Sequence, residues 1–188
     1  MENSRLNTAV LMAVLLFVHG QAARAQTRND PIDVNLIIDG SRYTQSLSGE
    51  IAEWLCDYVI DGILQDGDYV RIRIAAEKVQ TLYSGVFDRQ NGESIKTLLR
   101  APLPGTETVD FAGALGDIFS PAAKKNPLMT YTLLVSTPRG LSPVRLEAVV
   151  SYLRFSRVMD FPGWRALVVT PDTGPRAREA AEAFLSGR

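Results

Sequence analysis

The chain has 188 residues, of which 46% are hydrophobic and 22% charged, and its formal net charge is −1. This length fits one domain of ordinary size, and a near-neutral charge with both signs scattered argues against nucleic acid as a partner. Cys56 is the only cysteine, which excludes an internal disulfide. Its apolar, helical surroundings predict a buried thiol.

The first 25 residues have the pattern of a secretory signal. Arg5 supplies a positive charge, and residues 9–18 form an apolar run that is too short to span a bilayer, which takes about 20 residues. Ala23-Arg24-Ala25 has the small-x-small pattern that signal peptidase cleaves. We therefore predict a signal peptide over residues 1–25, a secreted or periplasmic bacterial location, and no membrane span after cleavage. The alternative is a leader retained as a single anchor.

Histidine chemistry is excluded from the rest of the chain. The only histidine, His19, lies in the predicted leader. Catalytic Ser/His/Asp and Cys/His arrangements and histidine metal sites are therefore ruled out after cleavage. Carboxylates, hydroxyls and backbone groups remain available for chemistry or binding.

Strands and helices alternate along the remaining sequence. Residues 34–38 are a short apolar, β-branched-rich run, which is typical of a strand buried on both faces of a parallel sheet. Apolar residues at helical spacing predict a helix near 47–59. The further predicted elements are strands at 69–75 and 78–87, a turn at 88–92, helices at 95–99 and 111–119, a strand at 128–135, a helix from 142 to about 155, a strand at 164–169 and a helix at 176–185.

This order predicts an α/β fold of Rossmann-like, three-layer α/β/α architecture over residues 32–186. We expect a mostly parallel central sheet in which the 78–87 strand is an antiparallel edge. In open α/β sheets, ligands bind where strands end at their carboxyl side. Asp39 and Ser41 directly follow the first strand, so this rim of the sheet is the predicted binding site.

Three stretches resemble a von Willebrand factor type A domain. They are the strand ending at Asp39-Gly40-Ser41, the segment 108–115, and the apolar strand that leads to Ser136-Thr137. In that family the first loop reads Asp-x-Ser-x-Ser, a later loop supplies a threonine, and an aspartate follows the fourth strand. Together these residues form the metal-ion-dependent adhesion (MIDAS) motif, which holds a divalent cation that a partner's carboxylate completes.

The resemblance implies that Asp39, Ser41 and Thr108 are metal ligands and that Mg²⁺ is the cofactor. The motif is degenerate, because Tyr43 stands where the second serine is expected, and Ser136 or Thr137 stands in place of the aspartate. Magnesium requires charged oxygen ligands in near-octahedral order. A site with one certain carboxylate is therefore expected to be weak.

The same residues also have local structural interpretations. Asp39 is typical of a residue that accepts a hydrogen bond from the backbone that follows it, in an Asx-type turn. Thr108 is suited to cap a helix. Asp110 is favoured near a helix start by the helix dipole. These interpretations compete with metal binding.

The function predicted from these features is that of an exported, non-enzymatic interaction module that binds a protein partner of the cell envelope at the rim. The alternative is a small periplasmic hydrolase or ligand-binding protein of Rossmann-like topology, using Asp39 and Asp110 as paired carboxylates. A third hypothesis is a structural accessory subunit that binds through a helix face or a sheet edge.

Overall fold

The computed structural model describes residues 30–116, 130–137, 139–140 and 164–169, together with residues 179 and 183. The predicted signal segment, the helix predicted at 142–155 and most of that at 176–185 lie outside the described residues. The described elements are β1 (Asp33–Asp39), α2 (Arg42–Gln45), α3 (Ser48–Trp54), the π-helical η1 (Leu55–Ile60), β2 (Tyr69–Ala75), β3 (Gln80–Val86), α4 (Arg89–Leu99), α5 (Phe111–Gly116), β4 (Thr130–Val135) and β5 (Trp164–Val169).

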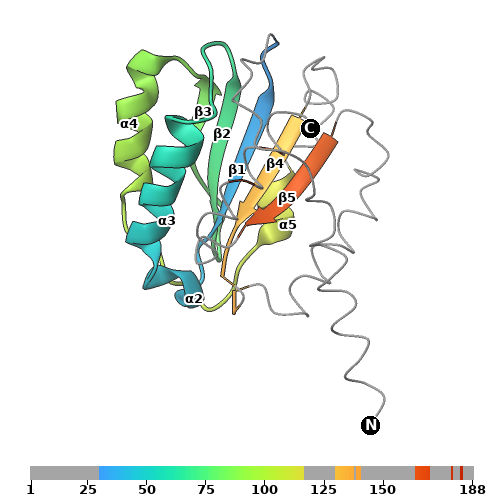
Figure 1. Cartoon of the computed structure of the whole chain (residues 1–188). Coiled ribbons are helices and arrows are strands. Elements are labelled where there is room, and N and C mark those ends of the chain that lie inside the picture. Colours follow the sequence, from blue (N-terminus) through green and yellow to red (C-terminus); the bar gives the residue numbers. More distant parts are fainter. Residues whose placement is uncertain are drawn as a thin grey trace.

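The described strands form one five-stranded sheet in the order β3-β2-β1-β4-β5. β1 runs parallel to β2 and β4, and β4 runs parallel to β5. β3 pairs antiparallel with β2 at the edge. The predicted mostly parallel sheet with one antiparallel edge strand is confirmed, and Figure 1 shows β1 in its centre.

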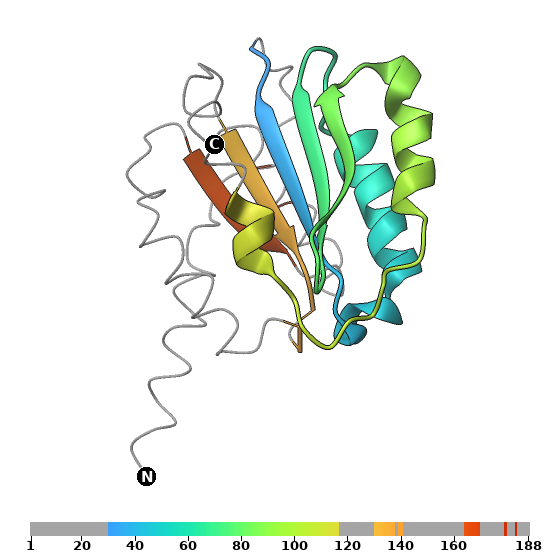
Figure 2. The same cartoon turned by 180° about the vertical axis from the view of Figure 1, so that it is seen from behind.

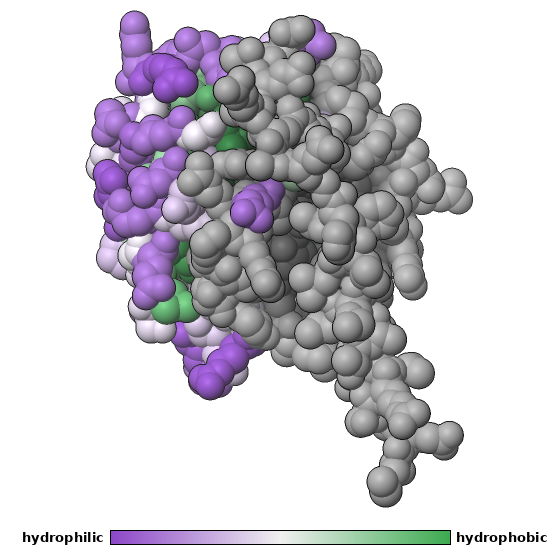
Figure 3. All heavy atoms as spheres, viewed as in Figure 1, coloured by the Kyte–Doolittle hydropathy of each residue, from purple (hydrophilic) through white to green (hydrophobic). Residues whose placement is uncertain are grey.

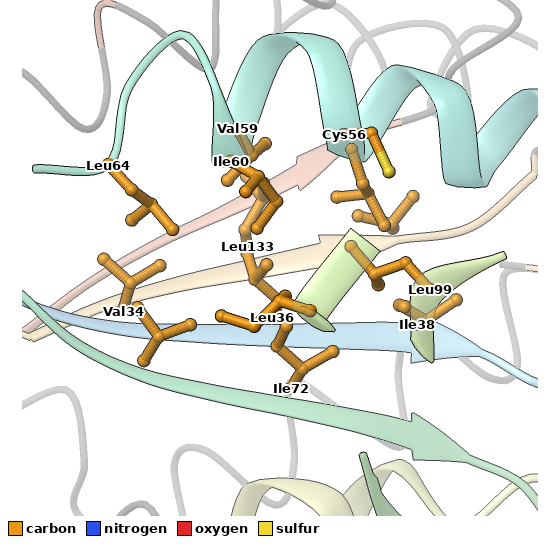
Figure 4. Packing of buried hydrophobic residues seen from close by; sticks show 14 of the residues in the cluster. Val34, Leu36, Ile38, Cys56, Val59, Ile60, Leu64, Ile72, Leu99 and Leu133 are labelled. Carbon is orange, nitrogen blue, oxygen red and sulfur yellow. The ribbon is translucent and has the colours of Figure 1, made fainter. Parts of the chain in front are cut away.

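The larger part of the core lies between the sheet and the helices α3, η1 and α4. All seven residues of β1 are buried, and alternate side chains, Val34, Leu36 and Ile38, pack on this face (Figure 4). Each fully buried aliphatic side chain contributes about 1.5–3 kcal/mol. Cys56 lies in this cluster, and its burial raises the pKa of its thiol, as expected for an unreactive cysteine.

The opposite face of the sheet carries a second cluster. Ile37 of β1 and Leu134 of β4 pack there against Phe111, Ala114 and Leu115 of α5. Because successive strand residues point to opposite faces, α5 covers the side of the sheet that faces away from α3 and α4 (Figure 2). The predicted three-layer α/β/α architecture is therefore confirmed.

An ion pair is built into this second face. Nη1 of Arg71 donates to both carboxylate oxygens of Asp33, at 2.7 and 2.9 Å, and to Oδ1 of Asn35 at 3.1 Å. The side chain of Asp33 is 1% exposed and that of Arg71 is 15% exposed. A charge buried to this degree is tolerated because it is paired and hydrogen-bonded.

The turn predicted at residues 88–92 is wrong, because residues 89–99 form helix α4. Asp88 accepts a hydrogen bond from the Asn91 N–H at 2.8 Å, and Oδ1 of Asn91 accepts one from the Asp88 N–H at 3.3 Å. This reciprocal capping box satisfies two N–H groups of the helix start. Gly92 is buried beside Phe87 and Ile60, so packing also favours the helix over the turn typical of Asn-Gly.

The variant Asp33→Ala is expected to lower the free energy of unfolding by about 3 kcal/mol, because it leaves the Arg71 charge largely buried without its carboxylate. Chemical denaturation measures this change. Glu93→Ala is the matched control: it removes an ion pair to Lys96 of the same 2.7 Å length, but Glu93 is 78% exposed. Its effect should stay below about 1 kcal/mol. Equal losses in the two variants would contradict the structural role of the buried pair.

Candidate functional site at the carboxyl ends of the strands

Asp39 is the last residue of β1 and has no exposed surface. Its Oδ1 accepts a hydrogen bond from the Ser41 N–H at 2.8 Å, and its Oδ2 accepts one from the Ser136 hydroxyl at 2.5 Å. The first contact is the Asx-type turn considered from the sequence. The second contact joins the end of β1 to the residue that follows β4, so the carboxylate links two neighbouring strand ends.

The loop after Asp39 is held close to the sheet. Gly40 donates its N–H to the carbonyl of Ala75 at 2.7 Å, and a Cβ at Gly40 would lie 2.9 Å from that carbonyl oxygen and 2.6 Å from the Ile74 side chain. The hydroxyl of Thr44 donates to the carbonyls of Asp39 and Ser41, at 2.5 and 2.8 Å. A glycine is therefore needed between the aspartate and the serine, and Thr44 fixes the turn.

Ser41 is brought to the site with its hydroxyl unpaired. The residue has no exposed surface, and its Oγ has no hydrogen-bond partner within the part of the chain that the structure describes. A buried hydroxyl without a partner costs about 1–3 kcal/mol. An additional group that pairs with this oxygen would recover that free energy.

The threonine that the structure places against this loop is Thr106, two residues before the predicted Thr108. Thr106 forms a parallel bridge with Ser41. Its carbonyl accepts from the Arg42 N–H at 3.0 Å, and its N–H donates to the Gly40 carbonyl at 3.0 Å. Thr108 is exposed, and its carbonyl accepts from the Thr106 hydroxyl at 2.8 Å.

Gly140, which follows the loop after β4, lies against the Asp39 carboxylate. Its N–H donates to Oγ1 of Thr137 at 3.0 Å, and a Cβ at this position would collide with Oδ2 of Asp39 and lie 2.5 Å from the Ser136 hydroxyl oxygen. No sequence motif had marked Gly140. Asp39, Ser41 and Ser136 are therefore buried together beneath the exposed residues of the rim. We call these three residues the centre of the site.

Asp110 caps the start of α5. Its residue is exposed, and its Oδ1 accepts a hydrogen bond from the Gly113 N–H at 2.7 Å. This is the helix-start role considered from the sequence. Asp39 is buried and bonded to Ser41 and Ser136, so the two carboxylates of the predicted hydrolase alternative serve separate structural functions.

Arg42, Tyr43 and Glu107 are exposed residues of the rim that contact one another. Nη1 of Arg42 lies 2.7 Å from Oε1 of Glu107, and Nη2 donates to the Tyr43 hydroxyl at 3.1 Å. The guanidinium carbon is 5.0 Å from the centroid of the Tyr43 ring. The hydrogen bond to Tyr43 and the charge of Glu107 both raise the pKa of Arg42.

The side chains around Asp39 offer few charged ligands to a cation. The described residues contain no group of three or more His, Cys, Asp or Glu side chains that would hold a metal ion. Asp39 supplies the one carboxylate, and Ser41, Thr106 and Ser136 supply hydroxyls. Oxygen ligands suit a hard dication. However, the one negative charge of Asp39 compensates only in part for the water molecules that the ion would lose on binding. The unpaired Ser41 oxygen is the observation that favours such an ion.

Solved structures that resemble this chain show its fold class. A von Willebrand factor type A protein from Catenulispora acidiphila matches with a TM-score of 0.58 at 13% identity, over 83% of this chain and 43% of that chain. An aerotolerance-related membrane protein from Bacteroides fragilis matches with a TM-score of 0.53 at 15% identity, over 74% and 67% of the two chains. Proximal thread matrix protein 1 from the mussel byssus, with a zinc-occupied MIDAS motif, gives 0.52 at 14% identity over 74% and 38%.

The chain therefore has a divergent fold of the von Willebrand factor type A kind, as the resemblance in its sequence implied. It spans less than half the length of the Catenulispora and mussel chains. No family model and no curated protein matches the sequence. Within the described residues, no helix is long and apolar enough to cross a membrane.

Gly140→Ala is expected to lower the free energy of unfolding by about 1–3 kcal/mol, because its methyl group would force the 136–140 loop away from Asp39. The matched control is Gly49→Ala in helix α3, where a Cβ meets nothing within 4 Å. That change should raise stability by about 0.5–1 kcal/mol. Denaturant titration of both variants measures the difference. A Gly140→Ala protein as stable as the parent would mean that the loop does not close over Asp39.

Proposed function

We propose that this chain is an exported, non-enzymatic interaction module that binds a protein partner of the cell envelope at the carboxyl-end rim of its sheet. The supporting observation is the set of hydrogen bonds that joins the 39–44, 105–108 and 136–140 segments into one unit. This is the edge where open α/β sheets bind ligands. Most of its buried polar groups, the Ser41 hydroxyl excepted, are hydrogen-bonded to one another, which suits a rigid contact surface better than a reaction centre.

The cation proposal concerns the centre beneath this surface. Asp39, Ser41 and Thr108 are the ligands predicted from the sequence, and Thr106, which forms a bridge with Ser41, is a further threonine beside them. Mg²⁺ bound there would add positive charge under the rim. The mussel protein with a zinc-occupied MIDAS motif supports a dication at this position of the fold. Because Asp39 is the one carboxylate at this site, the binding would be weak.

Export rests on the leader sequence over residues 1–25, and the bacterial membrane protein of similar fold agrees with an envelope location. Cleavage after Ala25 would leave Gln26 as the first residue. N-terminal sequencing of the protein recovered from the cell envelope fraction checks this assignment.

The variant Ser41→Ala tests whether the Ser41 hydroxyl binds a cation or only contributes to the stability of the fold. Without added metal, the variant should be as stable as the parent or more stable, because it removes an unpaired buried hydroxyl. With millimolar Mg²⁺ or Mn²⁺, the parent should show a rise in melting temperature, since a ligand that binds the folded state stabilises it by mass action. Ser41→Ala should lose this rise. A parent protein whose melting temperature does not respond to either ion would remove the cation from the proposal.

A photo-crosslinking amino acid at position 43 tests the contact surface in living cells. Tyr43 is 37% exposed on the rim, and Leu98, 40% exposed on α4, offers a matched control position. We expect position 43 to capture a discrete envelope protein that position 98 does not capture. The same products from both positions, or none from position 43, would contradict binding at the rim.

A further inference from the structure

β3 lies at one edge of the sheet, and no strand pairs with its outer side in the part of the chain that the structure describes. Figures 1 and 2 show this edge from opposite sides. Four of the seven residues of β3 are exposed, and Val86 is 57% exposed. The outer side of an edge strand presents backbone N–H and C=O groups with which another strand can pair.

The sequence of β3 lacks the usual protection of an edge strand. Natural edges are commonly blocked by charged side chains, above all lysine, or by proline. Residues 79–86 contain no charged residue and no proline, although Lys78 and Asp88 lie just outside this stretch. The side chains of β3 therefore do not repel a second strand by charge.

A β-bulge restricts the pairing to the second half of β3. Ile72 of β2 pairs with Tyr83, but the next residue, Arg73, pairs with Thr81, so Leu82 is an extra residue in the edge strand. A bulge disrupts the regular ladder and twists the strand. The regular edge is therefore the short stretch that follows Leu82.

The backbone of Ser84 points outward from the sheet. The Phe87 N–H donates to the carbonyl of Asp68, the residue before β2, at 2.7 Å, so Phe87 faces the sheet. The Val86 carbonyl accepts instead from the Tyr83 hydroxyl at 2.9 Å, so Val86 faces away from β2. Because successive residues of a strand alternate between its two neighbours, the N–H and C=O of Ser84 face outward as those of Val86 do.

The outward carbonyl of Val86 marks the far end of the usable edge. Besides the Tyr83 hydroxyl, it accepts from Nδ2 of Asn91 at 3.0 Å. Asn91 is held in place because its Oδ1 accepts from the Asp88 N–H in the capping box of α4. The open stretch thus lies between a bulge at Leu82 and a capped carbonyl at Val86, with Ser84 in its middle.

These limits favour a second copy of this chain as the occupant of the edge. Two copies related by a two-fold axis at Ser84 would pair antiparallel, with Ser84 opposite itself and Tyr83 opposite Gly85. In such an interface the same patch meets itself, and a charge on the axis would oppose its own copy at a cost in free energy. Ser84 is uncharged and small, and both copies offer an open stretch of the same length.

The neighbouring helical face offers less to a second copy. Figure 3 shows that the described part of the face formed by α3 and α4 is mainly hydrophilic. Its charged side chains are engaged with one another: Lys96 lies 2.7 Å from both Asp61 and Glu93, and Arg100 lies 3.0 Å from Glu53. The β3 edge, by contrast, has outward backbone groups at Ser84.

We propose that two copies of this chain associate through their β3 edges, antiparallel and with Ser84 on the two-fold axis, so that their sheets join into one. This inference goes beyond the proposed function, because it concerns the edge of the sheet and not its rim. The paired stretch is short and buries less than the about 1,200 Å² of stable interfaces. We therefore expect a dimer that forms as concentration rises and dissociates on dilution.

Sedimentation velocity from micromolar to millimolar concentration tests the proposal. The parent should shift from monomer to dimer over this range. Ser84→Lys should weaken the dimer by about fivefold, because like charges then lie directly opposite each other. Ser84→Pro should weaken it by about tenfold or more, because each copy loses the N–H that it donates. Proline is tolerated in the monomer where an edge N–H faces solvent.

A charge-swap mixture tests the position of the axis. Ser84→Asp alone should dimerise as poorly as Ser84→Lys alone, whereas an equimolar mixture of the two should form a heterodimer at least as readily as the parent forms its dimer. Native mass spectrometry distinguishes the heterodimer by its mass. A mixture that associates no better than either variant alone would overturn the pairing at Ser84.

The matched control is Ser94→Lys, which places the same charge at an exposed serine of α4. It should dimerise as the parent does. A parent that stays monomeric at millimolar concentration would overturn the proposal, as would equal effects of Ser84→Lys and Ser94→Lys. Ser84→Asp and Ser84→Pro still decide should Ser84→Lys fold poorly. Crosslinking at position 43 reports on the rim alone, so its failure would leave this dimer in place.

Discussion

The buried carboxylate of Asp39 is the constraint on which the rim depends. An isolated charge in a protein interior is very costly, and it persists when hydrogen bonds replace its water. Here the Ser41 N–H and the Ser136 hydroxyl supply those bonds. Because the two donors belong to loops after different strands, satisfying one carboxylate also fixes the two loops relative to each other.

This arrangement divides the rim into an inner and an outer layer. The inner residues Asp39, Ser41 and Ser136 are fully buried and determine where the loops lie. The outer residues Arg42 and Tyr43 are exposed. A carboxylate that is already bonded to two donors, and that is the only one of the centre, attracts a dication weakly.

The fold was readable from the sequence where side-chain pattern and burial coincide. The apolar run at 34–38 became the central strand β1, and the strands predicted at 69–75 and 164–169 are β2 and β5. The antiparallel edge predicted at 78–87 appears as β3, Gln80–Val86. The pattern failed at residues 88–92, where Asn-Gly favoured a turn. There the side chains of Asp88 and Asn91, three residues apart, cap a helix instead, and this local capping signal outweighs the turn preference of Asn-Gly.

By itself, the sequence determined the buried strand, the acidic residue at its end and the serine that follows, because strand periodicity and the start of a loop are local properties. The tertiary structure decided which partners those residues meet. Thr106 lies against Ser41, Gly140 covers the carboxylate, and Ser136 bonds to an aspartate 97 residues earlier in the chain. Such contacts follow from the register of parallel strands and the paths of their loops, and no spacing within one segment encodes them.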